Sequence, residues 1–123
     1  PAISIDRMIA NYDRILAIVE EKLPDIEIYM MAYYPINYEA AAEEMKPCLR
    51  VRTNGKIAMA NKAVQELAER HHAKYIDIND PLKDREGNLK AEYTIEGMHI
   101  KEEGYRAIFD LFMGYAKEQR WNV

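Results

Sequence analysis

Apolar residues recur at spacings of three and four along three stretches of the chain, which is typical of helices that bury one face. These stretches cover residues 5–23, 52–72 and 102–116. Two shorter runs, residues 26–34 and 74–79, are rich in branched and aromatic side chains and predict strands. The helical residues expected to face the core are Ile5, Met8, Ile9, Tyr12, Ile15, Leu16 and Val19, then Ile57, Ala60, Ala63, Val64, Leu67 and Ala68, and finally Tyr105, Ile108, Phe109, Phe112, Met113 and Ala116.

The order of these elements, helix, strand, helix, strand, helix, predicts one α/β domain over residues 1–123 with a parallel sheet. The first strand has no polar alternation, so we expect both of its faces to be covered. Two strands leave at least one edge of unpaired backbone groups, each costing on the order of a kcal/mol if buried without a partner. We therefore expect an upstream segment, a second copy or a partner chain to cover that edge. Residues 38–50 predict a loop or a frayed helix.

Composition and charge limit the kinds of molecule that the protein is expected to bind. The 123 residues carry a net charge of -4 and no basic cluster, which disfavours nucleic acid and anionic membrane surfaces. The longest apolar run, residues 28–36, is too short to span a bilayer. A single cysteine, Cys48, excludes an internal disulfide and favours the cytoplasm, although a secreted protein that has lost a leader would have the same composition.

The clearest chemical signal is Glu96 three residues before His99, on a predicted turn that contains Gly97 and runs into the last helix. A carboxylate at this spacing can accept a hydrogen bond from one imidazole nitrogen and leave the other free to take a proton. Taken alone, such a pair is more often two polar residues satisfied at a helix start.

Other polar side chains give weaker signals for a site. His71 and His72 are adjacent, so they point in different directions and predict a helix end instead of a metal site. No histidine and cysteine spacing typical of zinc occurs in the sequence. Cys48 predicts a free loop thiol. Asp80, after the second strand, is a second candidate for the acid that orients His99.

Several segments together resemble a known family. Tyr93-Thr94-Ile95-Glu96-Gly97-Met98-His99-Ile100, with Glu103-Gly104-Tyr105 behind it, is similar to the last block of the SGNH (GDSL-type) esterases and acylhydrolases. Asn11-Tyr12-Asp13-Arg14-Ile15-Leu16, Tyr34-Pro35-Ile36-Asn37, the helix with Asn61, and Lys74-Tyr75-Ile76-Asp77 follow the order of the family's C-terminal portion. The resemblance implies a three-layer α/β/α flavodoxin-like fold, of which this chain holds the C-terminal part.

The resemblance also implies roles for named residues. His99 is expected to be the general base, and Glu96 stands where the family has the orienting aspartate. The family needs no metal and no organic cofactor, and its serine and oxyanion blocks are expected upstream. Ser4 is the only serine here, and its place at the start of the first helix does not fit the nucleophile. Apart from the resemblance, Tyr33 or Tyr34, together with Asn37, is predicted from its place at the end of the first strand to line a cleft for a small-molecule ester.

Three hypotheses about function follow. The first is an ester hydrolase whose histidine and acid lie in this chain, which alone would be inactive for lack of the serine and oxyanion donors. The second is a non-catalytic binding or assembly module that pairs its open sheet edge with another chain. The third, a receiver or nucleotide-binding domain, is disfavoured because no glycine-rich phosphate loop follows either strand.

Overall fold

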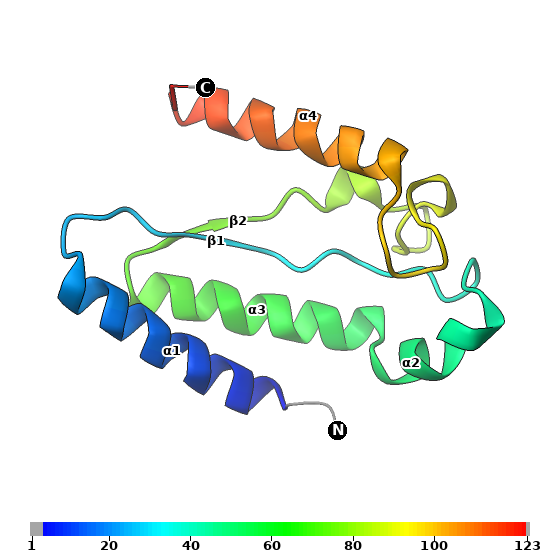
Figure 1. Ribbon diagram of the computed structural model, residues 1–123, viewed down its shortest axis with the longest axis horizontal. Coiled ribbons are helices and arrows are strands. Elements are labelled where there is room, and N and C mark those ends of the chain that lie inside the picture. The colour runs from blue at the N-terminus through cyan, green and yellow to red at the C-terminus, as the bar shows by residue number, and fades with distance from the viewer. Residues whose placement is uncertain (1–3, 123) are drawn as a thin grey trace. The chain divides into compact units, whose positions relative to one another are not determined.

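The computed structural model describes residues 4–122, which form two compact units (Figure 1). The first unit holds residues 4–33 and 55–77, and the second holds residues 34–54 and 78–122. None of the helices in this described range is long and apolar enough to cross a membrane. The expectation of one domain over residues 1–123 stays a prediction.

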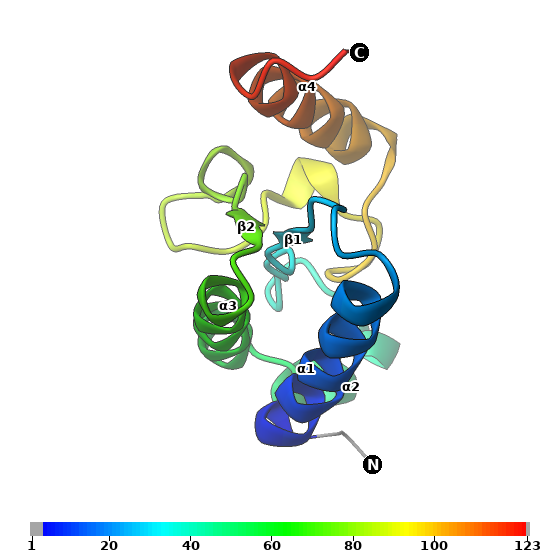
Figure 2. The same ribbon diagram turned by 90° about the vertical axis from the view of Figure 1, so that its left-hand side faces the viewer.

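The first unit pairs two short parallel strands beneath which two helices lie. Its elements are α1 (Ile5–Lys22), β1 (Tyr29–Met31), the part of α3 (Asn54–Arg70) from Gly55 on, and β2 (Lys74–Ile76). Met30 is opposite Tyr75 in the parallel register, which confirms the predicted strand, helix, strand arrangement. Figures 1 and 2 show α1 and α3 on the same side of the sheet.

An apolar core holds these helices and strands together. Leu16 of α1 and Met30 of β1 are buried against the α3 side chains Val64, Leu67 and Ala68. This part of the predicted helix faces is correct. Ile15, however, is 54% exposed, so the described chain buries a narrower stripe of α1 than the spacing predicts.

The first strand is shorter than the predicted run of residues 26–34. The strand ends at Met31, and the backbone of Tyr33 is hydrogen bonded to a side chain and not to a neighbouring strand. Asn61 Oδ1 accepts from the Tyr33 N–H at 2.8 Å. Asn61 Nδ2 donates to the Tyr33 carbonyl at 3.1 Å. The peptide of Tyr33 is thereby satisfied without a strand partner.

The second unit consists of short helical segments and one long helix. Its elements are η1 (Glu43–Met45), α2 (Lys46–Val51), η2 (Asp80–Leu82), η3 (Ala91–Tyr93) and α4 (Glu102–Glu118), so residues 38–50 are more helical than predicted. Leu82, Leu89, Ile100 and Ile108 form its buried core. Tyr105 and Phe109, predicted to be core residues of α4, are 59% and 62% exposed.

Candidate active site

The loop between η3 and α4 is a tight antiparallel turn that holds the predicted acid and histidine. Thr94 and Ile100 form an isolated antiparallel bridge, and Ile95 donates its N–H to the His99 carbonyl at 2.9 Å. The buried Thr94 side chain adds two hydrogen bonds, because Oγ1 donates to the His99 carbonyl at 2.7 Å and accepts from the Gly97 N–H at 2.9 Å. Backbone bonds and the Thr94 hydroxyl therefore hold this turn independently of the contact between the Glu96 and His99 side chains.

Gly97 is required by this backbone. Its φ of +103° lies in a region that residues with a side chain rarely adopt. A Cβ at this position would lie 2.6 Å from the Asn37 carbonyl oxygen and 2.9 Å from the Ala41 Cβ. The same close approach allows the Asn37 N–H to donate to the Gly97 carbonyl at 2.8 Å. Residues 37–41 thus pack directly on the turn.

Glu96 and His99 are in direct contact. Glu96 Oε2 lies 2.6 Å from His99 Nδ1, and Glu96 Oε1 accepts from the backbone N–H groups of His99 at 2.7 Å and Met98 at 3.2 Å. The longer side chain, compared with the aspartate of the resembled family, therefore still reaches the imidazole. The His99 side chain is 62% exposed and the Glu96 side chain 21%.

These contacts determine the charge of the acid and the tautomer of the ring. The hydrogen bond from the His99 backbone N–H, followed by that from its ring, lowers the pKa of Glu96 against a smaller opposing effect of burial. An ionised carboxylate only accepts hydrogen bonds, so the proton of a neutral His99 ring lies on Nδ1. Among residues 4–122 no group is hydrogen bonded to Nε2, whose lone pair is available to take a proton.

Asn37 supports this turn and is itself buried, at 5% exposure. Its Nδ2 donates to the Leu89 carbonyl at 2.8 Å, and its Oδ1 accepts from the Ala40 N–H at 2.9 Å. Both polar atoms of the side chain are therefore engaged by backbone. Through its own N–H on Gly97, Asn37 joins the Glu96 and His99 turn.

Tyr34, the other predicted cleft residue, packs against the apolar core of the second unit. Burial, and to a smaller extent the nearby Tyr105, raises the pKa of its phenol. It belongs to the same unit as Glu96 and His99, but it forms no hydrogen bond with either.

Thr94 is the supporting residue that the sequence reading missed. Its signal was available, because a threonine three residues before a glycine can cap a turn by accepting the glycine N–H.

The other sequence candidates have structural explanations. Asp80 is 97% exposed and pairs with Lys83 at 3.7 Å, so it does not contact His99. Ser4 caps α1 by accepting from the Arg7 N–H at 3.2 Å. Cys48 is a free, exposed thiol, and residues 4–122 contain no group of three or more side chains suited to a metal ion.

His71 does more than end a helix. Its Nε2 lies 2.5 Å from Asp13 Oδ1 and its Nδ1 2.6 Å from Glu20 Oε1, so the ring joins the end of α3 to two positions about two turns apart on α1. The two carboxylates raise its pKa despite opposing burial. The predicted place at the helix end is confirmed, and two ion pairs of the protonated ring add to it.

Comparison with known proteins identifies the family. The family model of GDSL-like lipases and acylhydrolases matches residues 2–107. The chain belongs to this family. The resemblance noted from the sequence is thus confirmed, together with the α/β fold class and its parallel strands. No curated protein matches the chain significantly.

Solved structures of three bacterial proteins share its fold. A candidate platelet activating factor from Streptococcus pneumonia is 31% identical, with a TM-score of 0.80 over 92% of this chain and 52% of that one. A candidate acylhydrolase from Bacteroides fragilis (21% identity, TM-score 0.72) and a GDSL-like lipase from Bacteroides thetaiotaomicron (18%, 0.71) match over 96% of this chain. The chain matches 54% and 55% of their lengths, and so spans about half of these proteins.

Proposed function

We propose that this protein is a serine-dependent ester hydrolase and that His99 and Glu96 are the base and the orienting acid of its triad. The family membership supports a hydrolase in general terms. The single observation that carries the finer proposal is the 2.6 Å contact between Glu96 Oε2 and His99 Nδ1 on an exposed ring whose Nε2 is unengaged among residues 4–122. A buried ring with both nitrogens bonded would not serve as a base.

In the proposed reaction, His99 Nε2 takes the proton of a serine hydroxyl as the serine oxygen attacks the ester carbonyl. The imidazolium then returns that proton to the leaving alcohol, and an acyl-enzyme remains. Water, deprotonated by the same nitrogen, attacks the acyl group and releases the acid and the free serine. The Glu96 carboxylate stabilises the imidazolium in both halves of the reaction. No step requires a metal or an organic cofactor.

The serine and the oxyanion donors are proposed to come from a segment outside this chain. Ser4 is occupied as the cap of α1, and the sequence contains no other serine. Tyr34 is proposed to form part of the substrate cleft. Asn37 is proposed to support the site indirectly, by holding the turn at Gly97, since its side chain is buried and both of its polar atoms are hydrogen bonded to backbone.

The test compares two histidine variants in the intact protein as its gene expresses it. His99→Asn keeps a side-chain N–H near Glu96 but has no nitrogen that can act as a base. We expect hydrolysis of p-nitrophenyl esters to fall on the order of 10³-fold or more in kcat. His72→Asn is the matched control, because His72 is exposed and its φ of +56° is one that asparagine tolerates. Equal kcat values in the two variants would refute the role of His99.

A second function, a non-catalytic module that pairs its sheet edge with another chain, is supported by one observation. Within the described residues the sheet has only the strands β1 and β2, so each strand has one edge that no strand covers. This alternative predicts a stable stoichiometric oligomer in solution. It also predicts no ester hydrolysis by the intact protein.

A further inference from the structure

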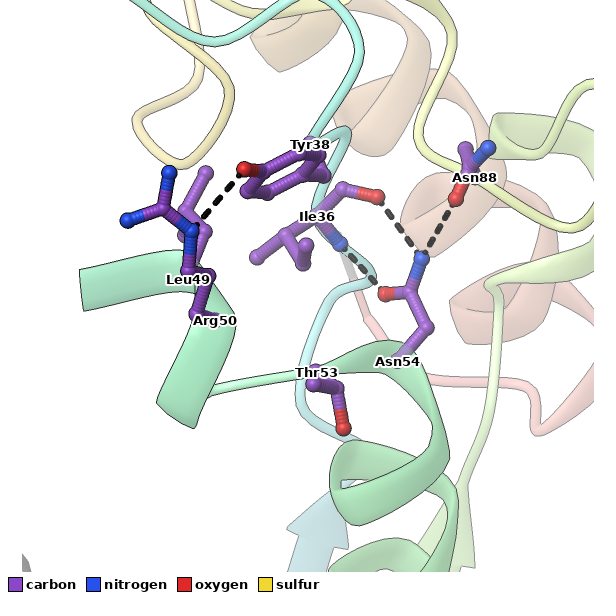
Figure 3. A pocket seen from close by; sticks show the side chains of 7 residues that line it. All are labelled: Ile36, Tyr38, Leu49, Arg50, Thr53, Asn54 and Asn88. Atoms are coloured by element: carbon purple, nitrogen blue, oxygen red, sulfur yellow. Dashed lines mark hydrogen bonds between the residues drawn. The ribbon is translucent and has the colours of Figure 1, made fainter. Parts of the chain in front are cut away.

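A second site candidate is an open groove in the second unit, with a volume of about 260 Å³. Its walls come from the segment after β1, from α2 and from the turn before η3 (Figure 3). The lining residues used below are Ile36, Tyr38, Leu49, Arg50, Asn54 and Asn88. The volume suits a molecule smaller than a typical drug-sized ligand.

The floor of the groove is apolar. Ile36 is 5% exposed and Leu49 1% exposed, and both face the groove. Figure 3 shows Ile36 between Tyr38 with Arg50 on one side and Asn54 with Asn88 on the other. A ligand in the groove would therefore place an apolar part over Ile36 and Leu49.

The side-chain amide acceptors around the groove are already used. Asn54 Oδ1 accepts from the Ile36 N–H at 2.7 Å, and Asn54 Nδ2 donates to the Ile36 carbonyl at 2.9 Å and to Asn88 Oδ1 at 2.8 Å. These three bonds engage the oxygens of both asparagine side chains and of the Ile36 peptide. A ligand that needs acceptors would find few here.

Donors, in contrast, remain. Arg50 Nε donates to Tyr38 Oη at 3.1 Å, which leaves the phenol O–H and the two terminal guanidinium nitrogens of Arg50. The bond to Asn54 engages Asn88 Oδ1 and leaves Asn88 Nδ2. Within residues 4–122 Arg50 has no ion pair, and no acidic side chain lines the groove. The nearby Lys46 is compensated by Glu43 at 2.9 Å.

We propose that this groove binds a small amphipathic anion, a short-chain carboxylate. Its carboxylate accepts from Arg50 and Tyr38 on one side of Ile36, and its short apolar chain covers Ile36 and Leu49 towards Asn88. The donor excess and the positive charge favour an anion, because a carboxylate on a guanidinium is a hydrogen bond with both partners ionised, whereas an uncharged acceptor has no charge of its own to add. The site does not depend on hydrolase activity, since neither Glu96 nor His99 lines it.

The test is a titration of the intact protein with butyrate, followed by calorimetry and by the NMR signals of the Leu49 methyl groups and the Asn88 side-chain amide. Butyramide has the same size without the charge, and inorganic phosphate has charge without an apolar part. Arg50→Gln removes the cation. Asn88→Asp keeps the acceptor for Asn54 and replaces the free donor by an anionic oxygen. Arg85→Gln is the control, because it makes the same charge change at an exposed residue outside the groove.

We expect saturable binding of butyrate, at least about tenfold tighter than that of butyramide or phosphate. Arg50→Gln and Asn88→Asp should each weaken it by about tenfold or more, and Arg85→Gln should leave it unchanged. Thermal unfolding of each variant separates loss of the groove from loss of the fold. The proposal is overturned by the absence of saturable binding, by equal binding of butyramide, by phosphate binding as tightly as butyrate, or by equal effects of Arg50→Gln and Arg85→Gln in folded proteins.

Discussion

Glu96 contacts His99 through both oxygens of its carboxylate, Oε2 at the ring Nδ1 and Oε1 at the backbone N–H. One side chain therefore positions both the backbone and the ring of the same residue. An aspartate is one methylene shorter and reaches less far from the same backbone. The glutamate that stands in place of the family's aspartate thus uses its extra length to contact both the ring and the backbone of His99.

Replacing Glu96 by glutamine should disturb the protonation of the His99 ring more than the stability of the fold. If the new amide nitrogen faces Nδ1, the ring must carry its proton on Nε2; if it faces the backbone, two N–H groups oppose each other. The first outcome removes the base at Nε2, and the second keeps it only with two opposed donors and without the negative charge that stabilises the imidazolium. We expect kcat of Glu96→Gln to fall on the order of 10³-fold with little change in KM.

The control for this variant is Glu92→Gln, which removes a carboxylate from the exposed Glu92 of η3. Its kcat should equal that of the unmodified protein. Ester hydrolysis by Glu96→Gln within about threefold of the control would contradict the assigned role of the acid.

Gly97→Ala should destabilise the protein more than Gly87→Ala. Both glycines have positive φ, +103° and +84°, so both substitutions introduce backbone strain of about 1–2 kcal/mol. Only at Gly97 does the new Cβ also meet backbone, at 2.6 Å from the Asn37 oxygen, whereas nothing lies within 4 Å at Gly87. Urea unfolding should show a free energy of unfolding lower by at least about another 1 kcal/mol for Gly97→Ala. Equal losses would mean that the turn yields easily.

Thr94→Val keeps the shape of a buried side chain and removes both of its hydrogen bonds. The Gly97 N–H loses its acceptor, and the His99 carbonyl loses one of two donors. We expect the free energy of unfolding to fall by about 1–3 kcal/mol and kcat to fall with it. Thr94→Ser, which restores the hydroxyl, should recover kcat; failure to do so would show that the methyl group, not the hydroxyl, matters.

The ion pairs of His71 should make stability depend on pH. Because folding raises the pKa of this ring above its ordinary value of 6.5, the ion pairs stabilise the fold fully below pH 6.5, and this stabilisation is lost as the pH rises through the folded pKa. The free energy of unfolding should therefore exceed that of His71→Gln by more at about pH 5.5 than at about pH 9. The free energy of unfolding of His72→Asn should equal that of the unmodified protein at both pH values. A difference between His71→Gln and the unmodified protein that does not change with pH would contradict the pH-dependent ion pairs of His71.

The sequence predicted the order and type of the main elements because their apolar spacing is regular. It placed the α1 and α3 contacts of Leu16, Val64 and Leu67 correctly. It failed for Ile15, Tyr105 and Phe109, since spacing shows that a face is apolar but not which neighbouring element covers it.

For the candidate site, the sequence brought Glu96 and His99 together because three residues on a glycine turn limit where their side chains can lie. It could not reveal that the Asn37 side chain donates a hydrogen bond to the Leu89 carbonyl, because that bond joins segments far apart in the chain. Contacts of this kind follow from the tertiary fold and leave no local pattern.

The hydrogen bond from Asn37 to the Gly97 carbonyl has a consequence for the timing of biogenesis. During synthesis Asn37 leaves the ribosome long before Gly97 exists, and the loop between them must close before the bond forms. A nascent chain therefore carries no supported imidazole until the segment from Asn37 to His99 has left the ribosome. Hydrogen exchange at the Asn37 amide would report the moment at which this support is complete.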